Sequence, residues 1–259
     1  MNLPIHQIDA FTSRRFRGSP AAVVVMDEWL PDDVMAAIAA ENNLSETAFV
    51  IPHPQVAPLR WFTPTIEVDL CGHATLATAH VMLDSYRPDA TTIRFATRSG
   101  EVAVTRRDEL LYMDFPARPP KPIAPNDSLV AALGARPRQV LMARDILAVF
   151  DSEDEIKRLR PDFNRIAALD AFAVIASAPG DHVDFVSRFF APAAGVPEDP
   201  VTGSAHCTLT PYWAEKFGKN KLSARQVSAR GGDLWCEMLG DRVMIAGGTV
   251  EYLRGEITI

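Results

Sequence analysis

Two copies of one short pattern constrain this chain more than any other feature of its sequence. The first copy runs Arg60-Trp61-Phe62-Thr63-Pro64 and leads through a polar loop to Cys71-Gly72-His73-Ala74. The second runs Arg188-Phe189-Phe190-Ala191-Pro192 and leads through a slightly longer loop to Gly203-Ser204-Ala205-His206. The two starts are separated by close to half of the 259 residues. This repetition predicts an internal duplication, with one active-site wall in each half.

Each copy has the composition of a strand, a loop and a helix in succession. Proline cannot donate to a sheet ladder and tends to close a strand. Small residues with helical spacing follow the glycine, at 74–83 and at 205–217. A helix that begins there presents free backbone N–H groups and the positive end of its dipole. Two such helix starts facing one another would make a cleft for a small anion such as a carboxylate.

The composition excludes several classes of function. With 47% hydrophobic residues, the chain can bury a large core in one large domain or two small ones. The net charge of −7 argues against nucleic acid as a partner. The longest apolar runs are too short to cross a bilayer, and residues 1–10 lack the pattern of a signal peptide. Three cysteines without CxxC spacing fit reduced thiols, so we expect a cytoplasmic protein without membrane contact.

The order of the predicted elements favours an α+β fold. Strands are predicted at 5–11, 22–26, 44–51, 59–62, 92–97, 102–106, 110–115, 140–142, 146–150, 171–177, 183–190, 227–229, 234–238, 243–246 and 250–253. Helices are predicted at 31–41, 74–83, 153–159, 161–168 and 205–217, with a further short helix capped by Asp127 or Ser128 and ended by Gly134. Strands and helices do not alternate as in a doubly wound sheet, so we predict mixed sheets packed on helices.

A proline-dense stretch near the midpoint, from Pro116 to Pro125, has the composition of a linker between halves. We therefore expect an N-terminal repeat domain at 1–116 and a C-terminal repeat domain at 117–259, with the active site between them. Whether the last strand returns to the first domain is left open.

Glu46 is the first candidate for chemistry. It lies where a loop becomes the apolar strand that includes Thr47-Ala48-Phe49-Val50. A carboxylate there is either exposed at the strand's edge or partly desolvated in a cleft. Desolvation would raise its pKa toward the range of a general acid or base. The alternative is an ordinary surface glutamate.

Other candidates come from the two loops. His73 follows the first loop glycine, where Ser204 stands in the second copy, and it is either a catalytic group or a structural hydrogen-bonding residue. Asp199, before Pro200, is either functional or a turn residue. Glu67 and Glu198 are expected to solvate their loops.

Cys71 and the histidines raise two further possibilities. A cofactor-free racemase needs a base on each face of the carbon, but the second loop has no cysteine at the matching place, so Cys71 is expected to pack or to line the site. The histidines do not cluster as in HExxH, which predicts no metal site. The chain also lacks GxxxxGK[ST], GxGxxG and GxSxG, which removes the usual nucleotide and hydrolase signatures.

Four segments together resemble the phenazine-biosynthesis PhzF-like family. They are Gln7-Ile8-Asp9-Ala10-Phe11-Thr12 with Gly18-Ser19-Pro20-Ala21-Ala22-Val23, Asn43-Leu44-Ser45-Glu46-Thr47-Ala48-Phe49, Asp69-Leu70-Cys71-Gly72-His73-Ala74-Thr75, and Glu198-Asp199-Pro200-Val201-Thr202-Gly203-Ser204-Ala205. They cover nearly the whole chain in order. One departure is Ser19, since the family commonly has asparagine there.

The resemblance implies a diaminopimelate-epimerase-like fold. In that fold two similar α+β domains each curl a mixed, mostly antiparallel sheet around a central helix, and the active site lies between them. It also implies a cofactor-independent isomerase, often a homodimer, in which Glu46 shuttles a proton and His73 and Asp199 are catalytic partners. Gly72, Ala74, Gly203, Ser204, Ser19 and Cys71 are then expected to contact substrate.

The combined hypothesis is a cytoplasmic isomerase that moves a proton between carbons of a small anionic metabolite. Two alternatives remain open. One is a two-base racemase or epimerase, for which the second loop offers only Asp199. The other is a non-catalytic binder of small anionic metabolites, which would not need a carboxylate at position 46.

Overall fold

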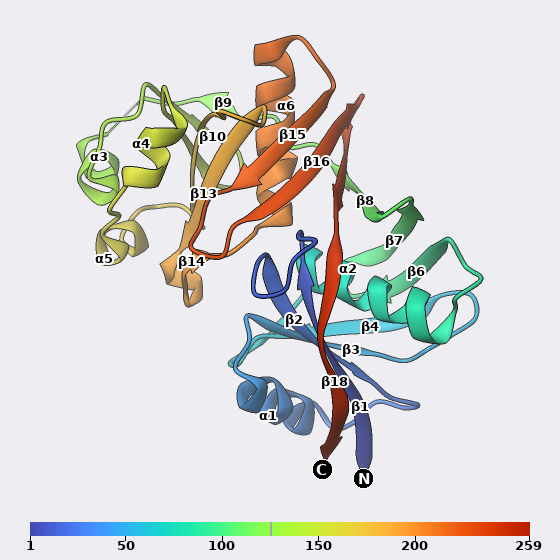
Figure 1. Cartoon of the computed structure of the whole chain (residues 1–259). Coiled ribbons are helices and arrows are strands. Elements are labelled where there is room, and N and C mark those ends of the chain that lie inside the picture. The colour runs from blue at the N-terminus through green and yellow to red at the C-terminus, as the bar shows by residue number, and fades with distance from the viewer. Residues whose placement is uncertain (125) are drawn as a thin grey trace. The chain divides into compact units, whose positions relative to one another are not determined.

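The computed structural model describes residues 1–124 and 126–259, and Pro125, the last proline of the expected linker, lies outside the described residues. The strands are β1 (Asn2–Ala10), β2 (Ser19–Val25), β3 (Glu46–Val50), β4 (Ala57–Phe62), β5 (Glu67–Val68), β6 (Thr92–Thr97), β7 (Gly100–Arg107), β8 (Leu110–Pro116), β9 (Lys121–Pro122), β10 (Gln139–Met142), β11 (Ile146–Val149), β12 (Val174–Pro179), β13 (Phe185–Ala191), β14 (Val196–Asp199), β15 (Lys221–Gln226), β16 (Gly232–Leu239), β17 (Arg242–Gly247) and β18 (Thr249–Thr258) (Figure 1).

The α-helices are α1 (Asp32–Asn42), α2 (Gly72–Val81), α3 (Asp127–Leu133), α4 (Glu153–Arg158), α5 (Phe163–Ala167) and α6 (His206–Phe217). A π-helical turn (Met82–Tyr86) continues α2, and 3-10 turns occupy Pro192–Ala194 and Gly203–Ala205. Within the described ranges, no helix is both long and apolar enough to cross a bilayer.

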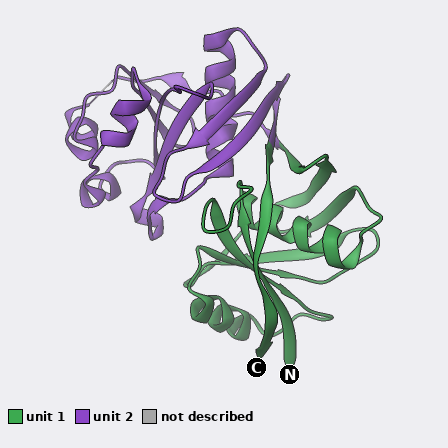
Figure 2. Cartoon of the chain, viewed as in Figure 1, with its two compact units in different colours: residues 1–114, 246–259 green, residues 115–245 purple. Residues whose placement is uncertain are grey.

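The chain forms two compact units, one of residues 1–114 with 246–259 and one of residues 115–245 (Figure 2). Residues 246–259 belong to the first unit because β18 pairs antiparallel with β1 from Thr249 to Thr258. The chain therefore leaves the first unit within β8 and re-enters it within β17.

The two units repeat one topology. In the first, β1 pairs antiparallel with β2, β2 parallel with β3, β3 antiparallel with β4, and β4 parallel with β6. In the second, β10, β11, β12, β13 and β15 pair in the same sequence of directions. The short strands β5 and β14 pair with β4 and β13 in corresponding places. The predicted duplication and α+β fold are therefore confirmed.

Each sheet has helices on its outer face. In the first unit, Met35 and Ile38 of α1 pack against Phe49 and Phe62 in one apolar cluster. In the second, α3, α4 and α5 pack against β12 and β13, with Leu129, Ile156, Ile166, Val174 and Phe190 among the buried members. Burying an aliphatic or aromatic side chain contributes about 1.5–3 kcal/mol, so these clusters are a main source of stability.

The inner face of the first sheet packs on α2, which is buried on nearly every side. Its small residues allow close approach to the strands, and the hydroxyls of Thr75 and Thr78 are satisfied within the helix. Thr75 Oγ1 donates to the Cys71 carbonyl at 2.5 Å, and Thr78 Oγ1 donates to the Ala74 carbonyl at 2.7 Å. A helix with its hydroxyls bonded to its own backbone can occupy the middle of a core without unpaired polar groups.

The corresponding helix of the second unit, α6, contains Pro211. Proline has no N–H, so the Cys207 carbonyl one turn earlier lacks its helical donor. The Arg118 N–H donates to that carbonyl at 2.8 Å instead. The backbone of the proline-rich stretch thus supplies the hydrogen bond that α6 lacks at Pro211.

The two arginines that start the duplicated pattern make the same ion pair in both units. Arg60 pairs with Glu67 through Nε and Nη2, each at 2.7 Å. Arg188 pairs with Glu198 in the same way, at 2.7 and 2.8 Å. Each guanidinium also lies over the second aromatic ring of its own pattern, at 5.1 Å from the centre of Phe62 and 5.0 Å from that of Phe190.

The expectation that Glu67 and Glu198 merely solvate their loops is therefore wrong. Bidentate arginine–carboxylate pairs fix geometry as well as charge. In each unit the pair ties the loop after the proline back to the strand before it, which holds the start of the next helix in place.

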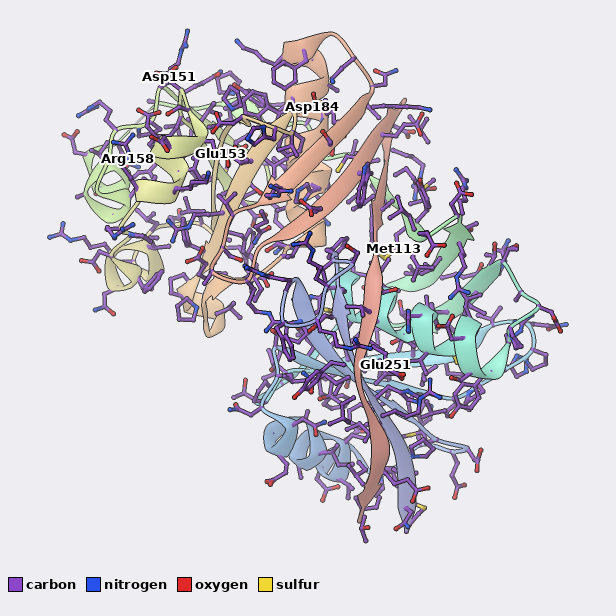
Figure 3. All side chains as sticks on the ribbon, in the orientation of Figure 1. Met113, Asp151, Glu153, Arg158, Asp184 and Glu251 are labelled. Atoms are coloured by element: carbon purple, nitrogen blue, oxygen red, sulfur yellow. The ribbon has the colours of Figure 1, made fainter. Side chains whose placement is uncertain are left out.

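We expect Arg188→Leu to lower the free energy of unfolding by about 2–4 kcal/mol, because breaking a partly buried pair leaves the partner charge uncompensated. Arg188 also donates to the Ile156 and Leu159 carbonyls, which would lose their partner too. The control is Arg158→Leu on α4 (labelled in Figure 3), whose pair with Asp154 is solvent-exposed and should cost about 0.5 kcal/mol. Urea denaturation of the two variants tests this difference, and equal losses would contradict it.

Three local predictions need correction. The α3 cap is Asn126, which accepts the Leu129 N–H at 2.7 Å, rather than Asp127 or Ser128. Residues 227–229 do not form a strand, whereas Lys221–Gln226 do. The strand ends there because Ser228 Oγ turns to the Pro200 carbonyl at 2.7 Å. The expected linker also contains β9, which pairs with β10.

Candidate active site

Glu46 is the first residue of β3 and lies directly after the turn that ends α1. Asn43 ends α1 in the left-handed conformation, with φ 48°. Side chains alternate along a strand, so Glu46 lies on the face opposite Phe49, which packs against α1. The carboxylate is thereby placed on the α2 side of the sheet, with 16% of its side chain exposed.

His73, the second residue of α2, meets Glu46 on that face. Its Nε2 lies 3.0 Å from Glu46 Oε2, and 6% of its side chain is exposed. The contact has the distance of an ion pair but not the alignment of a hydrogen bond, and Oε2 is buried without a hydrogen-bond partner among the described residues. A buried acceptor of this kind is rare in folded proteins. The structure thus brings the two predicted catalytic groups of the first half together.

Cys71 also lies beside this imidazole. Its Sγ is 3.5 Å from His73 Nδ1 and 3.9 Å from Nε2. The backbone of Cys71 is extended, and no side chain caps the start of α2. Gly72 and Ala74 lie in the first turn, so a helix start is next to the Glu46–His73 pair, and the Ala74 N–H is a hydrogen-bond partner of the Cys71 thiol.

Burial and charge set the protonation of this trio. Burial alone would lower the pKa of His73, but the neighbouring Cys71 and Glu46 more than offset it and raise the pKa well above 6.5. Burial, with the Glu46 charge, raises the pKa of the Cys71 thiol. A thiol with a raised pKa stays protonated at neutral pH. The site therefore brings a carboxyl group, an imidazole and a thiol together, and the pKa values of the imidazole and the thiol are both raised.

Ser19 begins β2, the strand that pairs in parallel with β3. It is fully buried, and its hydroxyl has no hydrogen-bond partner within the described part of the chain. Gly18 before it has φ +66°, and a Cβ there would lie 2.1 Å from the Ala10 carbonyl oxygen, so only glycine fits. The expected substrate contact of Ser19 stays a prediction.

The remaining predicted residues belong to the second unit. Asp199 ends β14, and Gly203 and Ser204 form the 3-10 turn before α6. Thr202 Oγ1 donates to Asp199 Oδ2 at 2.6 Å. His206 Nδ1 lies 2.9 Å from the Thr202 carbonyl, and burial lowers the pKa of His206 to about 4 although this hydrogen bond opposes the shift. His206 is therefore a neutral Nδ1–H donor that supports the loop.

Gln226, at the end of β15, holds this loop and was not predicted from the sequence. Its Oε1 accepts the Thr202 N–H at 2.9 Å, and its Nε2 donates to the Asp199 carbonyl at 2.7 Å. It is fully buried. A single glutamine in a polar strand carries no sequence signal of such a role, because the loop it binds is distant in the chain.

Replacing Gln226 by leucine should therefore destabilise the second unit. The buried Thr202 N–H would lose its acceptor and the Asp199 carbonyl would lose the Gln226 amide donor, which costs about 1–3 kcal/mol. Hydrogen exchange of the Thr202 amide should accelerate. The control is Gln139→Leu, which removes one partly buried bond from Tyr212 and should cost about 1 kcal/mol. Unchanged Thr202 exchange in Gln226→Leu would refute the role.

Comparison with known structures defines the class of fold. The chain is similar to the crystal structure of a phenazine biosynthesis protein of the PhzF family from Enterococcus faecalis, with a TM-score of 0.98, 46% identity and full coverage of both chains. It also resembles a hydroxyproline epimerase from Agrobacterium vitis, with a TM-score of 0.61, 11% identity and coverage of 99% and 92%, a likeness of fold alone. The diaminopimelate-epimerase-like fold predicted from the sequence is confirmed.

Comparison of sequences identifies the family within that class. A family model described as phenazine biosynthesis-like protein matches residues 8–255. An uncharacterized isomerase of Pseudomonas aeruginosa is 51% identical over 260 residues, covering both chains fully. A human phenazine biosynthesis-like domain-containing protein is 38% identical over 293 residues, again with full coverage. The chain belongs to the phenazine biosynthesis-like family, as predicted.

Proposed function

We propose that the protein is a cofactor-independent isomerase that moves a proton between carbons of a small carboxylate-bearing metabolite. The observation that carries this proposal is the buried Glu46 Oε2, which has no hydrogen-bond partner among the described residues and lies 3.0 Å from the Nε2 of His73. A carboxylate held in this way can take a proton from one carbon and return it to another. The isomerase names of bacterial relatives support the same class of reaction.

His73 is proposed to favour the ionised form of Glu46 before the proton is taken and after it is returned, and to balance the negative charge that develops on the substrate while Glu46 holds the proton. The first turn of α2 adds backbone N–H groups and a positive dipole end, which favour a substrate carboxylate. Asp199, Gly203 and Ser204 belong to the second unit, and their part in the reaction stays a prediction.

The two-base alternative is less well supported. It needs a second acid–base group on the opposite face of the carbon, and the second copy of the pattern offers only Asp199 for that role. A non-catalytic binder has no evident use for a carboxylate oxygen buried beside His73. We also propose a cytoplasmic location, supported by three free cysteines, and a homodimer, which rests on the family resemblance.

The test is proton exchange in D₂O, followed by NMR. The protein is incubated with a panel of small unsaturated and amino carboxylates, including dihydro-hydroxyanthranilate. We expect deuterium to enter one carbon of at least one compound as its isomer forms. A compound that binds but shows neither exchange nor isomerisation would favour the metabolite-binding alternative.

A further inference from the structure

The three side chains that meet at His73 share a property that proton transfer does not use: each ends in a metal-ligand atom. A carboxylate oxygen of Glu46, the Sγ of Cys71 and a ring nitrogen of His73 all lie within 4.8 Å of one another. Two of the separations are 3.0 Å, from Glu46 Oε2 to His73 Nε2, and 3.9 Å, from Cys71 Sγ to the same nitrogen.

We propose that Glu46, Cys71 and His73 form a binding site for a thiophilic divalent cation such as Zn²⁺, and that the bound ion inhibits the enzyme. In a tetrahedral zinc site the Zn–S distance is about 2.3 Å and the Zn–N and Zn–O distances are about 2.0–2.2 Å. Neighbouring ligand atoms are then about 3.3–3.6 Å apart. The two separations above differ from that range by a few tenths of an ångström, and the third, from Cys71 Sγ to a Glu46 oxygen, lies within 4.8 Å, so side-chain rotations must bring the three atoms onto the ion.

The ligand set selects the kind of ion. A thiolate and an imidazole favour Zn²⁺ and its soft or borderline neighbours, whereas Mg²⁺ and Ca²⁺ prefer oxygen ligands alone. Binding releases the proton of the Cys71 thiol and one proton of the His73 ring to solvent. The ion, the thiolate and the carboxylate then form a neutral group, which suits the buried positions of Cys71 and His73.

Three protein ligands leave one position of a tetrahedral ion open. That arrangement is typical of zinc sites that exchange water or substrate rather than of closed structural sites. The partly exposed Glu46 side chain gives the ion a route from solvent. The bound ion would occupy the carboxylate oxygen that the proposed isomerisation uses, so inhibition rests on the proposed function, whereas metal binding does not.

Titration with Co²⁺ tests the binding directly and needs no substrate. We expect one Co²⁺ per chain in the reduced, metal-stripped protein, with a thiolate-to-cobalt charge-transfer band in the near ultraviolet and the visible bands of a tetrahedral ion. Zn²⁺ should displace it. Cys71→Ser should abolish the charge-transfer band and weaken binding by about 100-fold or more, since even outer partners of metal ligands cost 10–100-fold.

The matched control is Cys207→Ser, which removes another buried thiol outside the trio and should leave the cobalt spectrum unchanged. If Cys71→Ser does not fold, Glu46→Gln serves instead and should retain the band with weakened binding. No band in the wild type, or an unchanged band in Cys71→Ser, would overturn the proposal.

A separate measurement addresses inhibition. With a substrate from the D₂O panel, micromolar Zn²⁺ should stop wild-type turnover, and EDTA should restore it. Full turnover by the Zn²⁺-loaded protein would overturn the inhibitory role. Absence of any turnover in the EDTA-treated protein would instead count against the proposed isomerase, and the cobalt spectrum would still decide the metal site.

Discussion

Glu46→Gln should abolish turnover while the protein stays folded. Glutamine has the shape of glutamate but cannot carry a proton between carbons at neutral pH. General acid–base groups contribute about 10²–10⁴-fold to rate, and a single shuttle that acts in both half-steps should lie at the upper end of that range. We expect kcat to fall by about 10³-fold or more, measured by NMR of product formation.

The control for this loss is Glu41→Gln. Glu41 is exposed on α1, five residues away, and its replacement should leave kcat unchanged. Circular dichroism and a cooperative thermal transition establish that Glu46→Gln is folded. If the variant keeps more than a few per cent of wild-type turnover, Glu46 is not the proton carrier.

His73→Gln should have the second largest effect, with kcat lowered by about 10²-fold. The variant loses the positive partner of Glu46 while keeping a hydrogen-bonding side chain. Wild-type activity should also fall at alkaline pH as the imidazolium of His73 deprotonates, because the pKa of His73 is raised. The residual activity of His73→Gln should not show this fall at alkaline pH. A loss of packing alone would lower the activity without removing its pH dependence.

The same histidine makes a prediction about stability. A group whose pKa is higher in the folded state than its unfolded value of 6.5 stabilises the fold fully below that value, and the contribution is lost as the pH rises through the folded pKa. The difference in unfolding free energy between wild type and His73→Gln should therefore be larger at about pH 6 than at about pH 9.

His80→Gln supplies the matched comparison for this pH dependence. His80 lies on the same helix, but burial lowers its pKa although Asp84 opposes the shift. Its stability difference from wild type should change with pH in the opposite direction. Parallel pH dependences for the two variants would contradict the assignment of a charged His73.

Much of the fold follows from local chemistry that is visible in the sequence. The duplicated arginine–aromatic–proline pattern predicts two strands that end beside helix starts, and β4 with α2 and β13 with α6 have that arrangement. Gly134 ends α3 with φ 70°, as a glycine after a short helix should. In these places the local preference and the final structure agree.

The errors arise where long-range contacts decide the outcome. Apolar and polar residues alternate at 227–229 as in a strand, but Ser228 Oγ donates a hydrogen bond to the Pro200 carbonyl instead. The strand β15 lies earlier in the chain, where Leu222 and Ala224 are buried. The partners of Glu67 and Glu198 could not be read from the loops, because a glutamate beside a loop proline looks the same whether it is solvated or paired.

Some features of the candidate site could also be predicted from the sequence, and others depend on long-range contacts. Glu46 and His73 were predicted from their positions at a strand start and a helix start, and the structure places them in contact. The contact of Cys71 with His73 depends on the rotation of the imidazole ring. The hydrogen bonds of Gln226 to the Thr202 N–H and the Asp199 carbonyl join segments that are far apart in the chain. Neither leaves a pattern in a single sequence.

The most direct measurement is the stereochemistry of proton delivery. A substrate from the D₂O panel is converted to low extent in D₂O by wild type and by Glu46→Gln, and the position and face of each deuterium are determined by NMR. A single carboxylate that shuttles the proton, and exchanges it with D₂O between the two transfers, should place one deuterium on the face from which the hydrogen left, with wild type only. Delivery to the opposite face, or equal incorporation by Glu46→Gln, would contradict a Glu46 shuttle.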